Sequence, residues 1–499
     1  MAETRRFAGV GGRRQLRALN NLGVINPTVS NVSAVLSAAT HGGKKIRSQE
    51  LDVFDAYYEG RQYLGKSDWN MSTSTDGSYI PIRDRKPLLQ FNFAKILASR
   101  LTSKLIGSRT FPTVKVEDDP DTSDFIRLMY RLSNLRAHLV MPIMRMVNTG
   151  SVLVRFSIVQ GTYKIQHYLA NHCYPEFDAA GELEAVKIQY VFDDEQDRDE
   201  HGKPIKKWYR LDLTKFTDIL YDNPKYEKGG EPQFEVVAQA EHNLGFVQAE
   251  WMRTYEQQNS IDGLSLIEPV MGYIDELNYS LSQSADAVQF NQDPQLLLKG
   301  MDEDEMEELI RSASKAWNLG REGDASLLEA GMSGVEAGME LRDKMKLGVQ
   351  DLTRIIMLDP EKMASHAQSG KSMEILHGPM VELVEELRPF LEKSLGKLTL
   401  KMMIATLAAE QLGVPSPITI PRGYRPKSLM LTFDWPNVFP QTVEDLQKKV
   451  SVASSVSSAN LISRETMTRW LAKDFGIEDI EEEIAKINAQ PILNPFSSF

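Results

Sequence analysis

The feature that most constrains this fold is a block of alternating hydrophobicity over residues 151–253, in a chain whose apolar residues otherwise recur at helical spacing. Side chains that alternate between apolar and polar lie on opposite faces of a strand. Turn signals such as Gln160-Gly161 and Lys228-Gly229-Gly230 separate the segments. The segments are SVLVRFSIV, YKIQHYL, LEAVKIQYVF, KKWYRLDL and FEVVAQAE. The pattern predicts an antiparallel sheet of five or six strands within a mainly helical α+β protein.

Helical spacing precedes this block. Residues 49–65 carry Leu51, Phe54 and Tyr58 on one side of a predicted helix. A polar stretch with two prolines predicts a loop between this helix and the next. That loop covers 68–90, and further helices are expected over 92–105 and, as one or two elements, over 121–147.

Helical spacing returns after the block. Ser265 and Glu268 have the spacing of a capping box, so a long helix is expected over 265–291. Pro389 lies inside the pattern of a second long helix over 379–410 and should kink it, because proline removes a backbone hydrogen bond. The other expected elements are strands over 295–300, 325–331 and 428–435, and helices over 302–320, 335–358, 443–454, 463–475 and 480–488.

Net charge, cysteine content and the length of apolar runs limit the classes of protein to which this chain can belong. The net charge of −12 argues against a chain that wraps nucleic acid tightly, since such contact needs a basic surface. Cys173 is the only cysteine, which excludes internal disulfides and a cysteine-based zinc site. No run approaches the roughly 18 apolar residues of a membrane span, and the N-terminus lacks the apolar stretch of a signal peptide. We expect a soluble protein made in a cytoplasm.

Charge is uneven along the chain. An N-terminal arm over 1–48 has many basic residues and almost no acid before Glu50. It reads either as a flexible tail that aids solubility or as a docking arm for an acidic partner. Its basic residues are Arg5, Arg6, Arg13, Arg14, Arg17, Lys44, Lys45 and Arg47.

The stretch SHAQSGKSMEIL, residues 365–376, contains the Gly-Lys-Ser triplet that ends a phosphate-binding loop. Such a loop needs glycine at both ends of GxxxxGK[ST], and here Ser365 occupies the first position. The loop should also follow a buried strand, whereas the preceding DLTRIIMLDPEKMA has helical character. Nucleotide binding at this stretch is therefore not expected.

Other catalytic or metal motifs are missing from the sequence. There is no HExxH and no GxSxG. His366 and His377 are eleven residues apart, with Gly378-Pro379 directly after the second, and are not expected to share a helix face. His201 lies among acids in DDEQDRDEHGKPI, which reads as a charged hairpin tip and not as a metal site. We expect no enzyme activity, no cofactor and no metal.

The order and spacing of these segments resemble the portal proteins of tailed bacteriophages, of the type found in long-tailed phages. The resemblance covers about 51–487 and departs from the family at Gln248, where proline is usual, and in the basic arm. The segments that carry it are YYEG, NFAKILASRLTSKLIG, AEHNLGFV, GLSLIEP with IDELNYSLS, QLLLKG, SGKSMEIL, LTFDWPNVFPQ, ANLISRETMTRWL and GIEDIEEEIAKI.

The resemblance implies a portal fold with named parts. Beyond the arm of 1–48 these are a wing of helices and antiparallel sheet (49–262), a stem helix (263–293), a small α/β clip (294–334), a second stem helix (335–358), a tunnel loop (359–378), a long kinked helix with a returning wing strand (379–440), a helical crown (441–490) and a tail (491–499).

The resemblance also implies candidate sites. In the tunnel loop, Lys371 and His366 would face DNA. The candidate residues of this loop are Ser365, His366, Gln368, Ser369, Gly370, Lys371 and Ser372. On the second stem helix, Lys344, Lys346 and Arg354 would either touch phosphates in the channel or be ordinary solvated charges. In the clip, docking of motor and adaptor would use Asp302, Glu303, Asp304, Glu305, Glu307, Glu308 and Arg311, although acids in a first helical turn also favour the helix dipole.

The function implied is that of a dodecameric ring at one capsid vertex, through which double-stranded DNA is packaged and ejected. The implied partners are further copies of the chain, the terminase large subunit, head-tail adaptor and tail proteins, and the major capsid and scaffolding proteins, without a membrane. The protein would be made in the host bacterial cytoplasm and reside in the virion. Another head-completion protein and an NTP-dependent DNA translocase are the alternatives.

Overall fold

The computed structural model describes two compact units. One comprises residues 1–357 with 383–436, and the other residues 358–382 with 437–499. The residues whose structure is described are 43–258, 260–292, 295–299, 324–328, 333–357, 377–411, 413–421, 423–438, 443–459, 461–472 and 480–489.

Among the described residues, four helices come before the alternating block, where three or four were expected. Side-chain caps fix two of their starts: Asn92 accepts a hydrogen bond from the Lys95 amide (3.0 Å), and Asp119 accepts one from the Thr122 amide (3.1 Å). Gly150, at φ 83°, ends the last one in a left-handed conformation. The helices are α3 (Gly43–Glu59), α4 (Phe93–Ile106), α5 (Pro120–Leu132) and α6 (Leu135–Thr149), and the loop between α3 and α4 contains a short 3-10 turn, η1 (Ile82–Asp84).

The alternating block forms eight strands in two antiparallel sheets, not one sheet of five or six. All five predicted segments are strands, and three further strands of five residues each were too short to show alternation. In the three-stranded sheet, β2 (Ser151–Val159) lies between β3 (Thr162–Leu169) and β9 (Ala249–Arg253). The five-stranded sheet runs in chain order through β4 (Cys173–Phe177), β5 (Leu183–Arg198), β6 (Pro204–Thr214), β7 (Thr217–Tyr221) and β8 (Val236–Glu241), with a 3-10 turn, η2 (Ala170–His172), before it.

One hydrophobic core joins the two sheets. Leu153 and Trp251 from the three-stranded sheet pack in the same cluster as Ile188 and Leu213 from the five-stranded sheet. Leu51 of α3 completes it, with 3% of its surface exposed. The two sheets and the first helix are therefore one packed region.

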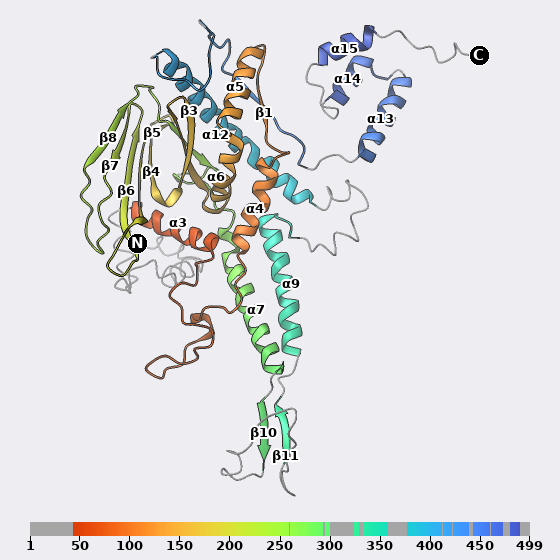
Figure 1. The fold of residues 1–499 in the computed structure, drawn as a ribbon. Coiled ribbons are helices and arrows are strands. Elements are labelled where there is room, and N and C mark those ends of the chain that lie inside the picture. Colours follow the sequence, from red (N-terminus) through yellow and green to blue (C-terminus); the bar gives the residue numbers. More distant parts are fainter. Residues whose placement is uncertain are drawn as a thin grey trace, which may run out of the picture. The chain divides into compact units, whose positions relative to one another are not determined.

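The predicted helix over 265–291 begins as a 3-10 turn, η3 (Glu268–Val270), and continues as α7 (Met271–Gln292). The Ser265 hydroxyl accepts a hydrogen bond from the Glu268 amide (3.1 Å), as the capping spacing predicts. Figure 1 shows α7 and α9 (Ser333–Thr353) side by side, with the antiparallel strands β10 (Gln295–Lys299) and β11 (Asp324–Leu328) beyond their ends. α9 stops at Thr353, five residues before the predicted end.

Small residues let α7 and α9 approach closely. A Cβ on Gly338 would lie 3.0 Å from the Ser284 hydroxyl, and one on Gly348 would lie 3.0 Å from the Tyr273 ring. Larger side chains at these two glycines would hold the helices apart.

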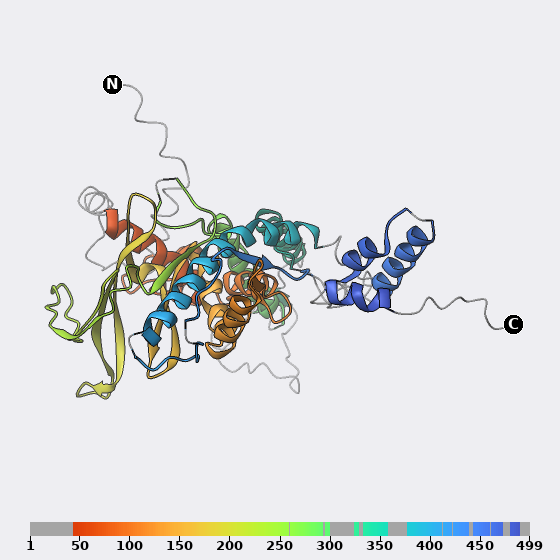
Figure 2. The ribbon, with the colours of Figure 1, turned by 90° about the horizontal axis from the view of Figure 1, so that it is seen from above.

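The longest helix, α12 (Gly378–Gln411), continues through Pro389. Its Leu387, Leu391 and Leu398 are buried, and Figure 2 shows it from above beside the strands. The predicted strand at 428–435 is β12 (Leu431–Asp434), and it pairs antiparallel with β1 (Thr113–Val116), a strand that alternation did not reveal.

In the smaller unit, three helices follow the predicted order. They are α13 (Val443–Ser458), α14 (Arg464–Ala472) and α15 (Ile480–Ala489).

Candidate functional site

The charges predicted to line a channel lie on and just after α9. Lys344 is widely exposed and pairs with Glu340 one turn earlier, at 2.7 Å. Arg342 pairs with its neighbour Asp343 at 2.8 Å, and Lys346 is half-buried. The exposed charges of α9 thus include close partners of opposite sign, which lowers the attraction of Lys344 for an external phosphate.

Arg354 differs from the other two candidates. It lies directly after α9 with φ at 57°, a left-handed conformation that disfavours residues with a side chain. Its guanidinium donates two hydrogen bonds of 2.7 Å to the two carboxylate oxygens of Glu386 on α12. Tyr255 donates to the same carboxylate (2.9 Å) and its ring packs edge-on against Phe390.

The charges of this cluster stabilise one another. Hydrogen bonds from Arg354 and Tyr255 lower the pKa of Glu386 to about 2. Burial, together with the nearby carboxylate, raises the pKa of Tyr255 to about 12. The cluster is therefore an ion pair at neutral pH, and it ties the end of α9 to α12.

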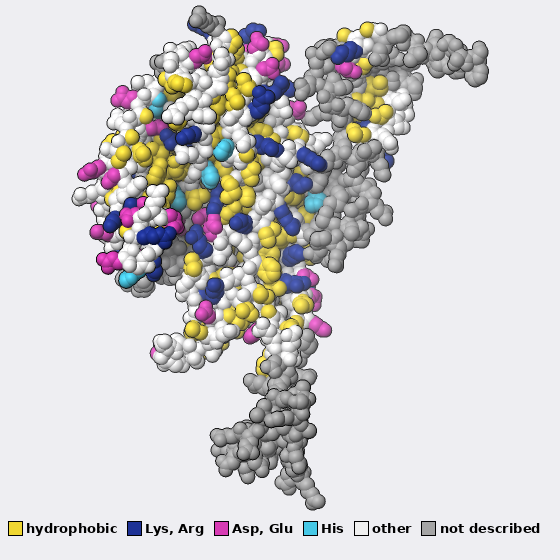
Figure 3. Space-filling view, in the orientation of Figure 1, with side chains coloured by type: hydrophobic (Ala, Val, Ile, Leu, Met, Phe, Trp, Pro, Cys, Tyr) yellow, Lys and Arg dark blue, Asp and Glu magenta, His cyan; other side chains and the backbone are white. Residues whose placement is uncertain are grey.

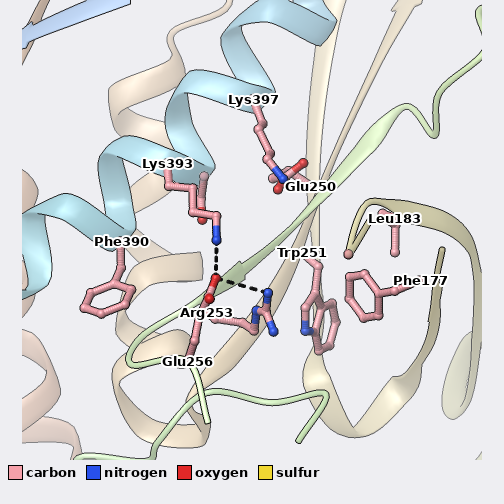
Figure 4. Close-up of a pocket in the computed structure, with 11 residues that line it drawn as sticks. Phe177, Leu183, Glu250, Trp251, Arg253, Glu256, Phe390, Lys393 and Lys397 are labelled. Carbon is pink, nitrogen blue, oxygen red and sulfur yellow. Dashed lines mark hydrogen bonds and ion pairs between the residues drawn. The ribbon is translucent and has the colours of Figure 1, made fainter. Parts of the chain in front are cut away.

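Three lysines on α12 form a second set of ion pairs, part of which Figure 4 shows. Lys393 contacts Glu256 (2.5 Å), Lys397 contacts Glu182 (2.6 Å) and Lys401 contacts Glu250 (2.7 Å). The lysines are spaced four residues apart, so they lie on one helix face. Their partners come from β9, from the loop after it and from the turn between β4 and β5, so one helix is bound to both sheets.

Glu250 is the most buried member of this set. Burial raises the pKa of its carboxyl, while the Lys401 ammonium lowers it. Lys401 also donates to the Ala249 carbonyl (2.8 Å). In Figure 4, Lys393 and Lys397 point from α12 toward Glu256 and Glu250, beside Trp251, Phe177 and Leu183. These residues line a cleft beside α12. Because the charges of the cleft pair with each other, it suits a structural contact better than a catalytic site.

A third cluster attaches α3 and the loop after it to α7. Tyr57 and Tyr63 each donate a hydrogen bond to the partly buried Asp275 carboxylate, at 2.6 and 2.8 Å. Lys66 donates to the Tyr279 hydroxyl (2.7 Å) and lies over the Tyr279 ring. Burial raises the pKa of Asp275 and lowers that of Lys66.

The part of the chain that the structure describes holds no group of three or more His, Cys, Asp or Glu residues suited to a metal ion. His201 is exposed at the turn between β5 and β6, where Asp199 accepts a hydrogen bond from its amide (2.9 Å). Burial raises the pKa of the Cys173 thiol, so the thiol is not an activated nucleophile. Among the described helices, none combines the length and apolarity that crossing a membrane requires.

Two groups of predicted site residues lie outside the described residues. These are Ser365, His366, Gln368, Ser369, Gly370, Lys371 and Ser372 of the tunnel-loop prediction, and Asp302, Glu303, Asp304, Glu305, Glu307, Glu308 and Arg311 of the clip prediction.

The last residues of the predicted basic arm, 43–48, belong to the fold as the start of α3. Arg47 lies in α3, pairs with Asp262 and donates to the Cys173 carbonyl at 2.7 Å. Sequence reasoning also missed the cluster at Asp275 and the lysines of α12. Of these, only the four-residue spacing of Lys393, Lys397 and Lys401 was visible as a signal in the sequence.

In these contacts, charged and aromatic clusters hold helices onto sheets and onto each other. The chain matches the family described as "Phage portal protein, SPP1 Gp6-like" over residues 42–491, and it therefore belongs to that family of phage portal proteins. The resemblance inferred from the sequence is thus confirmed, and the family is structural, not enzymatic.

Solved structures to which this chain is similar come from gene transfer agent particles. One is the virion of a native particle, at 10% identity and a TM-score of 0.43, covering 76% of this chain and 89% of that chain. Others are the neck of an empty particle, computed with C6 symmetry (10% identity, TM-score 0.42), and the neck of a native particle, computed with C12 symmetry (11% identity, TM-score 0.40), with the same coverage. None of the curated proteins matches this chain.

Proposed function

We propose that twelve copies of this chain form a closed ring at one capsid vertex, and that its channel passes double-stranded DNA during packaging and ejection. Membership of the portal family over residues 42–491 is the observation that carries this proposal. The paired helices α7 and α9, with the strand pair β10 and β11 beyond them, suit a stem that ends in a clip. Residues 49–262 would form the wing, 359–378 the tunnel loop and 441–490 the crown.

The charge of the chain supports a channel that DNA can slide through. Each copy carries a net charge of −12, so a ring of copies has a repulsive potential toward phosphates. Isolated basic residues would then make short-lived contacts, with Lys371 as the first candidate and Lys344 as a weaker one because of its pairing with Glu340. Arg354 would hold the stem helix to α12 and would not touch DNA.

The ring would serve as a docking platform. In this proposal the clip residues, including Asp302–Glu308 and Arg311, receive the terminase large subunit and later the head-tail adaptor and tail. The major capsid and scaffolding proteins surround the ring. ATP hydrolysis belongs to the terminase, the chain is made in the host bacterial cytoplasm, and its place of action is the virion vertex.

End-on electron-microscopy averages of the purified protein test the proposal. We expect closed rings with a central hole, and twelve copies at the vertex that joins head to tail in virions. A chain that stays a monomer or dimer at high concentration, and that is missing from that vertex, would contradict it. Nucleotide turnover by the purified chain alone would instead favour a translocase.

A further inference from the structure

The outer edge of the five-stranded sheet is open in this chain. β8 is the last strand of the sheet and pairs with β7 only (Figure 1). All six of its residues are exposed, including Val236 at 58% and Val237 at 64%. An exposed edge strand with apolar side chains is a template for another strand, and folded proteins usually cover or charge it.

The hydrogen-bond register identifies the free backbone groups. The His242 amide donates to the Phe216 carbonyl (2.9 Å), which makes these two residues a hydrogen-bonded pair. Such pairs alternate along an antiparallel ladder, so Ala240 and Ala238 are also bonded to β7. The amides and carbonyls of Gln239 and Glu241 therefore point away from β7.

The surroundings of β8 favour a chain segment as its partner. Phe216 and Tyr226 are 55% and 40% exposed, which adds apolar surface to that of the two valines. The opposite edge of the sheet is not open in this way, because Cys173 and Pro175 of β4 are buried. A strand added to this sheet would thus lie along β8.

The distribution of charge indicates which segment of the chain would bind along β8. Residues 173–241 contain seventeen Asp and Glu residues against nine Lys and Arg residues. Figure 3 shows acidic side chains along the margin of the molecule where Figure 1 has β6, β7 and β8. The first 42 residues carry five arginines and one acid, Glu3. Within them, VINPTVSNVSAVL (24–36) is rich in β-branched residues, which favour strands.

The arm is attached at a suitable place and is long enough. α3 begins at Gly43, and its Arg47 donates to the Cys173 carbonyl at the start of β4. From β4 to β8 is four strand spacings, about 19 Å. A 42-residue arm reaches up to roughly 140 Å when extended, so the chain's own arm can cross the sheet without a neighbouring copy.

We propose that the chain's own N-terminal arm, through residues 24–36, adds a strand to the free edge of β8 and is held there by attraction between its arginines and the acidic sheet. The composition of the arm allowed it to dock on an acidic partner. In this proposal the acidic partner is the five-stranded sheet of the same chain. The proposal does not require ring closure.

Photo-crosslinking tests which segment occupies the edge. A photoreactive residue is placed at Gln239 of the full-length chain, in an equal mixture of heavy-isotope and ordinary protein. We expect crosslinks to residues 1–42 that join peptides of the same isotope composition. Crosslinks that join heavy to ordinary peptides would show a neighbour's arm, and crosslinks outside residues 1–42 another partner; either result, or no crosslink, would overturn the proposal.

Hydrogen exchange tests the role of charge. The five arginines of residues 1–42, which are Arg5, Arg6, Arg13, Arg14 and Arg17, are changed to glutamate in one full-length variant and to lysine in a matched control. Exchange at the Gln239 and Glu241 amides should be at least tenfold faster in the glutamate variant, and unchanged in the lysine variant. Ala238 and Ala240, bonded to β7, should not respond. Equal exchange at Gln239 in all three proteins would contradict the proposal.

Discussion

Asp52 is a partly buried carboxyl, and we expect its charge to lower the stability of the fold. It lies in α3 and accepts a hydrogen bond from the Asn171 side chain (2.6 Å), yet burial raises its pKa from 3.8 to about 6. Because the folded pKa is above the unfolded one, this group adds stability as pH falls through 6, and the gain is complete below about 3.8. Asp52→Asn keeps an acceptor for Asn171 and removes the charge. We expect it to raise the free energy of unfolding at pH 7 by up to about 3 kcal/mol.

Urea unfolding at pH 7 and at pH 4.5 measures this effect. The difference between variant and parent should shrink at the lower pH, where the parent's Asp52 is protonated. A variant that is less stable at pH 7, or a difference that does not depend on pH, would show that Asp52 is ionised without cost.

Arg354 combines a strained backbone with an ion pair, and two substitutions separate these effects. Arg354→Ala loses the pair with Glu386, which is partly exposed and contributes about 0.5 kcal/mol. Arg354→Gly loses the same pair but relieves the left-handed conformation, so it should be about 1 kcal/mol more stable than Arg354→Ala. Thermal unfolding of both variants checks the order, and equal stabilities would mean that the backbone is not strained.

Residue roles that depend on distant partners could not be predicted from the sequence. Arg47 was assigned to the basic arm because its neighbours are basic, while its partner Asp262 lies 215 positions away. Tyr57 and Asp275 are 218 positions apart. Local patterns report which face of an element is apolar, and they carry no information on which remote residue meets a given side chain.

Helices and strands could be predicted where the segment was long enough for a periodic pattern of apolar residues to appear. The five longest alternating segments are strands, and the helices predicted after 263 that fall on described residues appear in the predicted order; the helix predicted over 302–320 lies outside the described residues. By contrast, β4, β7 and β9 have five residues each. A segment that short gives two or three alternations, which does not distinguish a strand from a loop. The end of α9 was missed because the strain at Arg354 is a property of the folded backbone.

Lys401 tests whether α12 needs its ion pairs. Its side chain is 12% exposed and that of Glu250 is 9% exposed, so Lys401→Met leaves a buried carboxylate without its cation. We expect a loss of about 3 kcal/mol in the free energy of unfolding. Lys393→Met is the matched control, because Lys393 is 53% exposed, and it should cost under about 1 kcal/mol.

Adding Glu250→Gln to Lys401→Met should recover most of the loss, since no buried charge then remains. Denaturant titration of the four proteins gives the comparison. Equal losses in the free energy of unfolding for Lys393→Met and Lys401→Met would show that burial of the ion pair does not determine the size of the loss.

The close packing of α7 and α9 can be tested at one glycine. Gly338→Leu places a side chain against Ser284, where a Cβ alone would already be 3.0 Å from the hydroxyl. We expect a loss of about 2 kcal/mol from the separation of the helices. Ala337→Leu, on the exposed side of the same turn, should change stability by less than about 0.5 kcal/mol. Thermal unfolding measures both, and similar losses would show that contact with α7 is not the cause.

At the scale of the whole molecule, a substitution at Lys371 can distinguish a role in ring assembly from a role in contact with DNA. If the proposed ring is correct, Lys371→Ala should leave ring formation unchanged, because a channel contact does not hold subunits together. The amount of DNA packaged or retained should change, since a basic contact with phosphates is lost. Electron microscopy and the DNA content of particles measure the two outcomes.

Lys371→Arg is the matched control, because it keeps the charge. It should package DNA as the parent does. A Lys371→Ala protein that fails to form rings would show that the residue is structural.

The pairing of β1 with β12 has a consequence for how the protein is made. Thr113 lies opposite Asp434, so the two strands of this small sheet leave the ribosome more than three hundred residues apart. At synthesis rates of about 5–20 residues per second, at least about 16 seconds pass after β1 is made before its partner strand emerges. Until then a growing chain exposes the edge of β1 to the crowded cell, and early release of the chain leaves that edge open for degradation.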